Sequence, residues 1–486
     1  MKKLLMLVPC CLWMIAACSK NSVPENGEKK PDVATSEVLA EQNLLRAMQM
    51  VDSAVAAYFT GSGMAMARYY NPYTGVRSDE KGSIWMYTSS VEAVNAILCA
   101  LKALKDKGLP ELYNARFDHY AALLTKLYDN MDYYRGTFQL TSYTRSRESN
   151  QQWSVYAVNR SSGKNSANVE REQNVYDDQQ WIIRELLESY KVTGENVYLE
   201  KAEYLAEYVL DGWDCTRTAD GGEVGGIPWG PAYATKHACS NGPMVSPLVW
   251  LHELYREKND EIEHRYIDAD DRRTRRTQMK KKSDYYLDFA KKVYAWQKEY
   301  LLRPDGVYDD LRGGDNRKVN DTEVVDGQTY KKGVALEGRA GPAITYNSGT
   351  MLSGAADLYR ATKEEAYLND AKKLSDASFR YFAKLNETVS GHYTYDISGF
   401  RSWFNGVLMR GYAETYPMYS DVSVALKSFQ DNLDYAYKNF FYKGFLPVNL
   451  LVGWSRSGDG NNKVEGMFTF AFAAEYAVLA RYEIEK

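Results

Sequence analysis

Two adjacent aspartates at the start of a predicted helix are the most chemically informative feature of the sequence. Asp177 and Asp178 lie in the hexapeptide YDDQQW (176–181), where a long polar stretch ends and a helical pattern begins. One aspartate there caps the first turn, because unpaired backbone N–H groups and the helix dipole favour negative charge. Capping requires only one aspartate, so it does not explain the second. Consecutive side chains diverge, which puts the carboxyl carbons roughly 5–7 Å apart, near the separation that retaining glycosidases use.

Two carboxyl groups at this distance do not ionise independently. One is expected to stay protonated and serve as a general acid while its neighbour is ionised. The spacing therefore leaves two readings open, which are helix capping alone and catalysis by a carboxyl pair.

A second Tyr-Asp-Asp triplet, at 308–310, provides an internal comparison. It is followed by Arg and Gly rather than by a helical pattern, so we interpret it as part of a turn. Further aspartates surround it, but their spacing does not fit a calcium-binding loop. We expect a solvated loop at this place.

Other catalytic chemistries have no motif in the sequence. The five histidines lack paired metal-ligand spacing, no glycine-rich phosphate loop follows a strand, and no nucleophile elbow accompanies a Ser-His-Asp set. We therefore expect no metal site and no cofactor.

Helices must position the aspartates, because apolar residues recur at three- and four-residue spacing through the body of the chain. No convincing set of alternating strands accompanies this pattern. It predicts twelve helices, at residues 37–58, 90–105, 112–131, 179–191, 197–211, 243–256, 284–301, 348–361, 366–384, 403–416, 422–440 and 465–483.

The predicted helices pair into hairpins. Residues 189–205 (SYKVTGENVYLEKAEYL) align without gaps with 358–374 (LYRATKEEAYLNDAKKL), so that Ala202 matches Ala371. Hairpin repeats of this kind stack side by side and bury their apolar faces. Six hairpins, with the first and last helices paired, predict an all-α fold, an (α/α)6 toroid. An open superhelix is the alternative.

Long and short connections alternate along the chain. The long ones, rich in glycine, asparagine, serine and aromatic residues, are 132–175, 212–242, 302–347 and 385–402. In a toroid this alternation gathers the long loops on one face, where we expect the cleft. The charged run 256–282 interrupts the third hairpin, and we expect it to be a solvated insertion or a helix extension.

The composition narrows the class of ligand. Lys and Arg number 60 against 64 Asp and Glu, and this net charge of −4 argues against a nucleic-acid partner. The chain has 40 Tyr, 10 Trp and 15 Phe. These exceed the needs of a core, since each buried tyrosine hydroxyl requires a partner. Such a surplus suits a wet cleft that stacks on ligands, and sugars are the obvious candidates.

The N-terminus resembles the export signal of bacterial lipoproteins. A basic pair precedes an apolar run of 14 residues that ends at Ala17, directly before Cys18. We expect 1–17 to be a lipoprotein signal peptide, Cys18 to carry lipid, 18–36 to be a flexible tether, and 37–486 to be a single catalytic domain. An ordinary secretory signal is the alternative.

Three cysteines remain in the body of the chain. Cys99 lies in an apolar run, which favours a buried side chain. A bridge between Cys215 and Cys239 stays open, because pairing cannot be read from sequence.

The order of the motifs resembles a known family. YDDQQW is followed by GGEVGGIPW, KHACSNGP, TYNSGTMLSGAADLYRAT and WFNGVLMRGYAETY, and the set resembles glycoside hydrolase family 76 from about residue 40 to the C-terminus. The resemblance implies an (α/α)6 barrel, a retaining mechanism and α-mannan as the substrate. It also implies that Asp177 is the nucleophile and Asp178 the general acid/base.

The resemblance extends to seven further positions. It implies that aromatic rings stack on the sugar and that side-chain amides form hydrogen bonds with its hydroxyl groups. These positions are Trp85, Gln179, Trp229, Asn241, Tyr346, Asn347 and Phe404. A core or turn role is the alternative for each of them. Ser348 and Asn405 depart from the family pattern, which leaves the preferred glycan open.

We therefore expect an endo-acting, retaining hydrolase of α-1,6-mannosidic bonds in α-mannan. It would act as a monomer, held in the cell envelope by a lipid anchor at the outer membrane, facing either the periplasm or the surface. Three alternatives stay open. They are a non-catalytic glycan-binding lipoprotein, a toroid hydrolase or transglycosidase acting on another α-linked glycan, and a structural envelope protein.

Overall fold

The computed structural model describes residues 35–313 and 321–486, and Ser36–Lys486 form one compact unit. The expectations for the signal peptide and for Cys18 lie outside the described residues. The predicted tether, 18–36, also lies outside the described residues, apart from residues 35 and 36. Ser36 is already the first residue of a helix.

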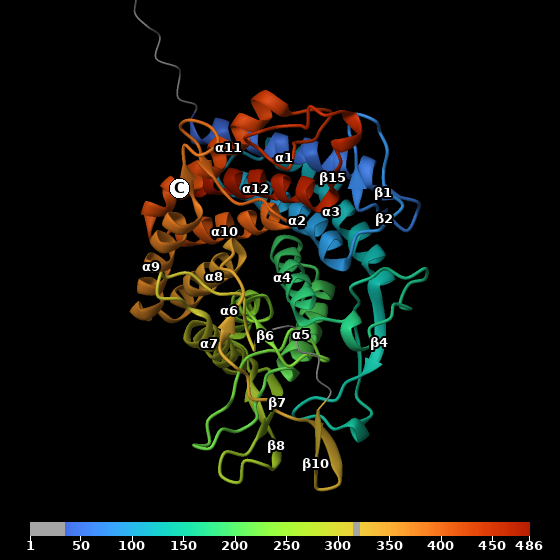
Figure 1. The fold of residues 1–486 in the computed structure, drawn as a ribbon, viewed down its shortest axis with the longest axis vertical. Coiled ribbons are helices and arrows are strands. Elements are labelled where there is room, and N and C mark those ends of the chain that lie inside the picture. Colours follow the sequence, from blue (N-terminus) through green and yellow to red (C-terminus); the bar gives the residue numbers. More distant parts are fainter. Residues whose placement is uncertain (1–34, 314–320) are drawn as a thin grey trace, which may run out of the picture. The chain divides into compact units, whose positions relative to one another are not determined.

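Helices account for most of this unit (Figure 1). Each of the twelve predicted windows contains one, and the largest difference is at α2, which begins at Ile84 rather than at residue 90. Ser83 causes this earlier start, because its side chain accepts the N–H of Met86 at 3.3 Å and caps the first turn. The helices of the described chain are α1 (Ser36–Tyr58), α2 (Ile84–Asp106), α3 (Glu111–Met131), α4 (Tyr176–Thr193), α5 (Asn196–Asp211), α6 (Gly242–Tyr255), α7 (Lys282–Leu301), α8 (Thr345–Thr362), α9 (Glu365–Phe382), α10 (Arg401–Thr415), α11 (Ser423–Phe440) and α12 (Gly466–Glu485).

The helices alternate between an inner and an outer layer. The even-numbered helices contact one another in chain order, and α12 contacts α2, so the inner layer closes on itself. The first helix, α1, packs along the last, α12, and completes the sixth pair. The predicted (α/α)6 toroid is therefore confirmed, and an open superhelix is excluded.

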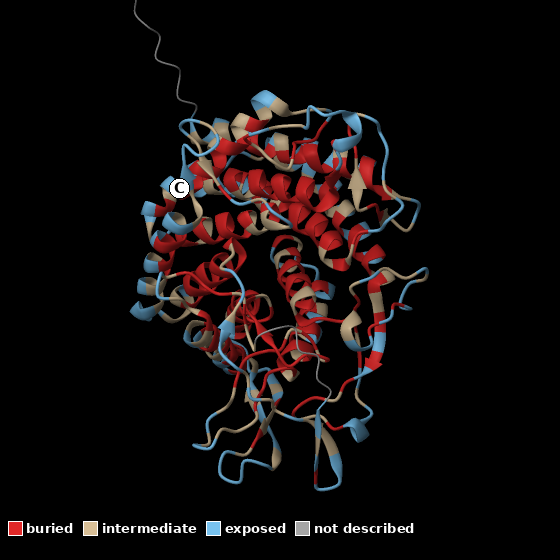
Figure 2. Cartoon of the chain, viewed as in Figure 1, coloured by how far each residue is buried: buried red, intermediate tan, exposed pale blue. Residues whose placement is uncertain are grey.

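The inner helices form the core of the ring (Figure 2). A Cβ atom on Gly349 of α8 would lie 2.7 Å from the Cα of Leu408 in α10, so only glycine permits this close approach. Helix α2 is long and apolar enough to cross a membrane. However, 83% of that stretch is buried inside the protein, as is typical of a core helix.

The internal sequence repeat corresponds to two equivalent hairpins. Gly194 ends α4 and Lys363 ends α8, both in the left-handed conformation, with φ of 77° and 62°. Each N–H donates at 2.8 Å to the carbonyl of the tyrosine four residues earlier. Ala202 and Ala371, matched in the repeat, are both completely buried. The repeat therefore preserves both the turn and the packing position that follows it.

The strands are short and lie in the connections between helices. One sheet has three strands, in the order β12-β9-β6, and the other described sheets are antiparallel pairs. The strands are β1 (Phe59–Thr60), β2 (Ala65–Met66), β3 (Tyr69–Tyr70), β4 (Arg135–Gln139), β5 (Gln152–Tyr156), β6 (Lys236–His237), β7 (Glu261–Ile267), β8 (Arg275–Lys281), β9 (Leu311–Arg312), β10 (Thr322–Val325), β11 (Gln328–Lys331), β12 (Arg339–Ala340), β13 (Lys384–Leu385), β14 (Tyr393–Thr394) and β15 (Val464–Glu465).

The charged run 256–282 is a β-hairpin, so the expected helix extension is wrong and the expected insertion is correct. Strands β7 and β8 pair from Glu261 opposite Lys281 to Ile267 opposite Arg275. The isoleucine and tyrosine residues of EIEHRYI favour a strand, in which His264 and Ile267 are buried while Glu261 and Glu263 are exposed.

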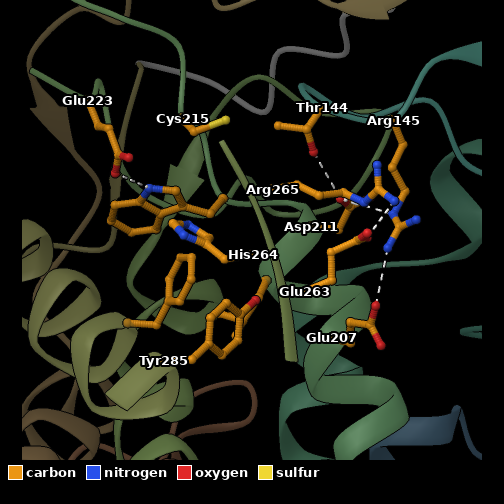
Figure 3. A pocket seen from close by; sticks show the side chains of 13 residues that line it. Thr144, Arg145, Glu207, Asp211, Cys215, Glu223, Glu263, His264, Arg265 and Tyr285 are labelled. Atoms are coloured by element: carbon orange, nitrogen blue, oxygen red, sulfur yellow. Dashed lines mark hydrogen bonds and ion pairs between the residues drawn. The ribbon is translucent and has the colours of Figure 1, made fainter. Parts of the chain in front are cut away.

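Residues of β7 line a small pocket together with residues of the outer helices α5 and α7, with His264 on the side of Tyr285 and Arg265 on the side of Asp211 (Figure 3). His264 packs against Tyr285 of α7, with ring centroids 5.7 Å apart. An ion pair of 3.2 Å joins Arg145 to Glu207 of α5 in the same cluster. The cavity enclosed there is only about 30 Å³, which has room for water but not for a sugar ring.

The long connections meet at one end of the ring. Each inner helix begins after a long connection. Where another helix follows, the inner helix ends before a short turn, except for α6, which ends before the β7–β8 hairpin. Because the two helices of each pair run in opposite directions, the N-termini of all inner helices lie on the same face. Asp177 and Asp178, in the first turn of α4, are therefore placed at this face.

Candidate active site

A cleft of about 450 Å³ opens where the long loops meet the N-termini of the inner helices. Four inner helices, α2, α4, α8 and α10, contribute their first turns to it. The cleft is lined by Trp85, Asp177, Asp178, Trp181, Trp229, His237, Cys239, Asp310, Leu311, Pro342, Ile344, Tyr346, Ser398, Gly399, Phe400, Arg401 and Phe404.

Both predicted catalytic aspartates face this cleft. Val175, which cannot cap with its side chain, occupies the N-cap position of α4. The N–H of Tyr176 donates to the carbonyl of Trp229 at 2.8 Å, and the indole Nε1 of Trp229 donates to Oδ2 of Asp177 at 3.1 Å. These two bonds tie the start of the helix to the loop before α6. Neither Asp177 nor Asp178 is the N-cap residue of the helix.

The two carboxyl groups differ in their hydrogen bonds. Asp177 accepts two hydrogen bonds, from the Trp229 indole at 3.1 Å and from the N–H of Asp178 at 3.0 Å. No described residue donates to the carboxyl group of Asp178. The donors therefore converge on one member of the pair.

This difference separates the pKa values of the pair. Burial raises the pKa of Asp177 from 3.8 to about 6, and the hydrogen bonds that its carboxylate accepts limit the rise. Burial, together with the negative charge of Asp177, raises the pKa of Asp178 well above its ordinary value. The larger rise falls on Asp178, so Asp178 is the member of the pair that more readily holds a proton.

Aromatic side chains form one wall of the cleft. Trp85 and Phe404 stack with ring centroids 5.9 Å apart and an interplanar angle of 18°, and Phe400 meets Trp85 edge-on at 4.9 Å. The Nε1 of Trp181 donates to the hydroxyl of Tyr346 at 2.7 Å, which fixes both rings. Rigid aromatic faces of this kind suit the apolar face of a pyranose ring. Together with Trp229, the predicted aromatic residues all line the cleft.

Three amides expected at the substrate lie behind the cleft wall instead. Gln179, Asn241 and Asn347 are 0% exposed. Gln179 exchanges two hydrogen bonds with the backbone of Tyr156, at 2.7 and 3.1 Å, and Asn241 does the same with Ile227, at 3.0 and 2.8 Å. Asn347 donates to two backbone carbonyls of the loop before β9. The expectation that these amides contact the sugar directly is therefore wrong. Their hydrogen bonds stabilise the loops that form the cleft.

The second Tyr-Asp-Asp triplet contributes to the cleft, which corrects its interpretation as a solvated turn. Asp310 lines the cleft, whereas Asp309 forms 3.0 Å ion pairs with Arg303 and Arg339. Burial raises the pKa of Asp310 from 3.8 to about 6, and no described residue donates to its carboxyl group. The repeated triplet was a sequence signal for this residue. Its orientation, however, depends on the pairing of β9 with β6, which only the structure shows.

The motif KHACSNGP supplies two more cleft residues that sequence reasoning missed. His237 stacks on Trp229, with ring centroids 5.0 Å apart, and burial lowers its pKa to about 4, so the ring is neutral at physiological pH. Cys239 is a free thiol and does not pair with Cys215. Within residues 35–313 and 321–486 no group of three acidic, histidine or cysteine side chains is arranged to hold a metal ion.

A family model matches most of the ring. The model described as Glycosyl hydrolase family 76 matches residues 108–260 and 275–440, which is more than half of the chain. The unmatched residues 261–274 between these segments are β7 and the turn that follows it. A comparison with curated proteins gives no match.

Solved structures share the fold over nearly the whole chain. The glycoside hydrolase family 76 (mannosidase) Bt3792 from Bacteroides thetaiotaomicron VPI-5482 is 21% identical, with a TM-score of 0.64 over 91% of this chain and 99% of that one. The second is the α-1,6-mannanase GH76A of Salegentibacter sp. HEL1_6, in complex with α-1,6-mannotriose. It is an inactive variant with two consecutive aspartates changed to asparagine, 18% identical, with a TM-score of 0.58 over 90% and 99% of the two chains. At these identities the structures establish a common fold.

Proposed function

Because the chain belongs to glycosyl hydrolase family 76, and so is a glycoside hydrolase, we propose that it cleaves α-1,6-mannosidic bonds in α-mannan, as a retaining and endo-acting enzyme. Asp177 is the nucleophile and Asp178 the general acid/base in this proposal. The observation that supports these roles is the asymmetry of the pair, in which two hydrogen-bond donors stabilise charge on Asp177 and no described residue donates to Asp178.

The proposed reaction is a double displacement. Protonated Asp178 gives its proton to the glycosidic oxygen as the bond to the anomeric carbon breaks, and the Asp177 carboxylate attacks that carbon to form a β-mannosyl ester. Ionised Asp178 then takes a proton from water, whose oxygen attacks the same carbon and releases Asp177. Two inversions at one carbon give net retention.

The charge of the cleft supports a neutral sugar as substrate. Arg401 is the one cationic side chain among the lining residues, against the carboxyl groups of Asp177, Asp178 and Asp310. This balance disfavours acidic glycans, whose charges would meet two or more carboxylates. The α-1,6-mannotriose complex of the Salegentibacter protein supports mannan in particular.

Products from unbranched α-1,6-mannan test the proposal. We expect α-1,6-mannooligosaccharides of several lengths early in the reaction, followed by chromatography, and none from a variant carrying both Asp177→Asn and Asp178→Asn. Release of mannose alone would contradict endo action. Binding without any product would favour a glycan-binding protein, and products from a different α-linked glycan, or transfer to an added acceptor sugar, would favour the other toroid enzymes.

Asp310 is proposed to bind a hydroxyl group of the substrate, because it is an acceptor in the cleft without a donor among the described residues. Asp310→Asn is expected to lower kcat/KM by about 10- to 100-fold, mainly through KM, since a hydrogen bond to a charged group contributes about 1.5–3 kcal/mol. Asp309→Asn is the matched control. It removes two ion pairs and should lower Tm while leaving KM unchanged. An unaltered KM in Asp310→Asn would remove this residue from the substrate site.

The lipid anchor on Cys18 and a location in the cell envelope are also part of the proposal, supported by the order of basic, apolar and small residues before Cys18. In bacterial cells supplied with labelled palmitate, the wild type should carry the label and partition with membranes, and Cys18→Ser should do neither. Label on the serine variant would contradict the anchor. We further propose that the protein acts as a monomer.

A further inference from the structure

An indole N–H from a loop of the cleft donates to the proposed nucleophile. Trp229 lies in the connection between α5 and β6 and lines the cleft. Its Nε1 donates to Oδ2 of Asp177 at 3.1 Å. Building on the function proposed above, we infer that Trp229 is a positioning residue, whose indole N–H holds the Asp177 carboxylate in the orientation needed for attack on the anomeric carbon.

Contacts within the protein fix the position of this indole. The backbone N–H of Trp229 donates to the carbonyl of Thr235 at 3.0 Å, and its own carbonyl accepts the N–H of Tyr176 at 2.8 Å. His237 stacks on the indole with ring centroids 5.0 Å apart, and Tyr233 packs against it at 4.8 Å. The bond to Tyr176 joins Trp229 to the first turn of α4. The indole and the carboxylate are therefore fixed relative to one another before any substrate binds.

Both oxygens of the Asp177 carboxylate are held. The N–H of Asp178 donates to Oδ1 at 3.0 Å, and the Trp229 indole donates to Oδ2. A carboxylate held in this way has little freedom to rotate about its Cβ–Cγ bond. Such rotation would move the attacking oxygen away from the anomeric carbon, and misplacement by about 1 Å can cost 10²-fold in rate.

The chemistry of an indole suits this position. Its N–H is a hydrogen-bond donor that carries no charge, so it orients the carboxylate without forming an ion pair. A lysine or arginine at the same place would hold the pKa of Asp177 lower and weaken it as a nucleophile. In the second step Asp177 leaves as a carboxylate, and the same N–H stabilises the charge that develops on it.

Stacking on the sugar, which the family resemblance implies for Trp229, is a different role. Trp229→Phe separates the two, because phenylalanine keeps an aromatic face and has no N–H. A residue that acts solely by stacking would change KM in this variant and leave the pH profile as it is. A positioning residue would lower kcat more than it changes KM, and would leave Asp177 protonated up to a higher pH.

Other ionisable groups surround Asp177 and Trp229. They are Asp178 on α4, Tyr233 before β6, His237 in β6, Cys239 after β6, Asp310 before β9, Tyr346 on α8 and, facing Asp310, Arg401 on α10. Burial raises the pKa values of the tyrosines and the thiol and lowers that of His237 to about 4, so these groups stay neutral near pH 6. Asp310, with a pKa of about 6, overlaps the titration of Asp177. Measurements in an Asp310→Asn background therefore separate the two.

The first experiment compares pH profiles of kcat/KM on unbranched α-1,6-mannan in this background. Trp229→Phe should lower kcat by about 10- to 100-fold. It should also move the acid limb to higher pH by about 1 unit, because loss of a donor favours the protonated form of Asp177. Trp213→Phe is the matched control, since the Trp213 indole also donates to a carboxylate, that of Glu223 at 2.8 Å, and does not line the cleft. Its profile should match that of the background.

The second experiment does not depend on turnover. The protein is labelled with ¹⁵N-tryptophan, and the indole resonance of Trp229 is assigned as the one that Trp229→Phe lacks. This resonance should shift as the pH is lowered through about 6, when Asp177 takes up a proton, and should lose the response in Asp177→Asn. If mannan is not cleaved at all, the proposed function fails while this arm still tests the contact. An indole resonance that does not titrate near pH 6, or a Trp229→Phe profile that matches its background, would overturn the inference.

Discussion

Asp177→Asn is expected to lower kcat/KM on unbranched α-1,6-mannan by about 10⁴-fold or more, because an amide neither attacks the anomeric carbon nor leaves from it. The amide oxygen can still accept the Trp229 Nε1–H, which now lies 3.1 Å from Oδ2 of the carboxylate. The ring should therefore fold normally, and the loss should fall on the chemical step rather than on stability. Initial rates and thermal unfolding of the same preparation measure the two effects separately.

A surface aspartate provides the control for this substitution. Asp305 pairs with Arg303 in an exposed turn, at 2.8 Å, and does not line the cleft. Asp305→Asn should retain wild-type kcat/KM. Turnover by a folded Asp177→Asn protein within about 10-fold of wild type would exclude Asp177 as the nucleophile.

Asp178→Asn is expected to lower kcat/KM on mannan by about 10²- to 10⁴-fold, the range that general acid catalysis contributes. An aryl α-mannobioside with a good leaving group should be affected far less, because its departure needs no proton. Sodium azide should then restore turnover and yield an α-mannosyl azide, since azide attacks the intermediate without general base help.

The pH profile of the same variant gives a second readout. In the wild type, activity should fall below about pH 6, as Asp177 becomes protonated, and should fall again at high pH, as Asp178 loses its proton. Asp178→Asn should keep the acid limb and lose the alkaline limb. An unchanged alkaline limb, or equal losses on aryl mannobioside and mannan, would contradict the role of Asp178.

The ring architecture could be predicted from sequence because outer helices such as α9 bury one stripe of their surface, which imposes a three- to four-residue period, while inner helices such as α12 are apolar and buried on most sides. The repeat at 189–205 and 358–374 also indicated how the helices pair. The hairpin at 256–282 could not be predicted in the same way. Its two seven-residue strands are strongly charged and lack a regular alternation of buried and exposed side chains, so their sequence does not resemble an amphipathic strand.

The proposed catalytic pair could be found because it is local, two aspartates in the first turn of one helix. The remaining cleft residues depend on contacts between distant segments. Asp310 lies in the cleft because β9 pairs with β6. Asn241 lies behind the cleft wall because its amide forms hydrogen bonds with the backbone of Ile227. An amide that binds sugar hydroxyls cannot be distinguished in sequence from an amide that stabilises a loop, since both simply need hydrogen-bond partners.

Trapping of the glycosyl-enzyme tests the central claim most directly. The Asp178→Asn protein is incubated with a 2-deoxy-2-fluoro-mannobiosyl fluoride, whose good leaving group allows the first step while the second step is slowed. Mass spectrometry of the intact protein should show one added fluoromannobiosyl unit, and fragmentation should locate it on Asp177. An adduct on another residue, or hydrolysis of α-1,6-mannan to products of inverted anomeric configuration without any adduct, would contradict the account.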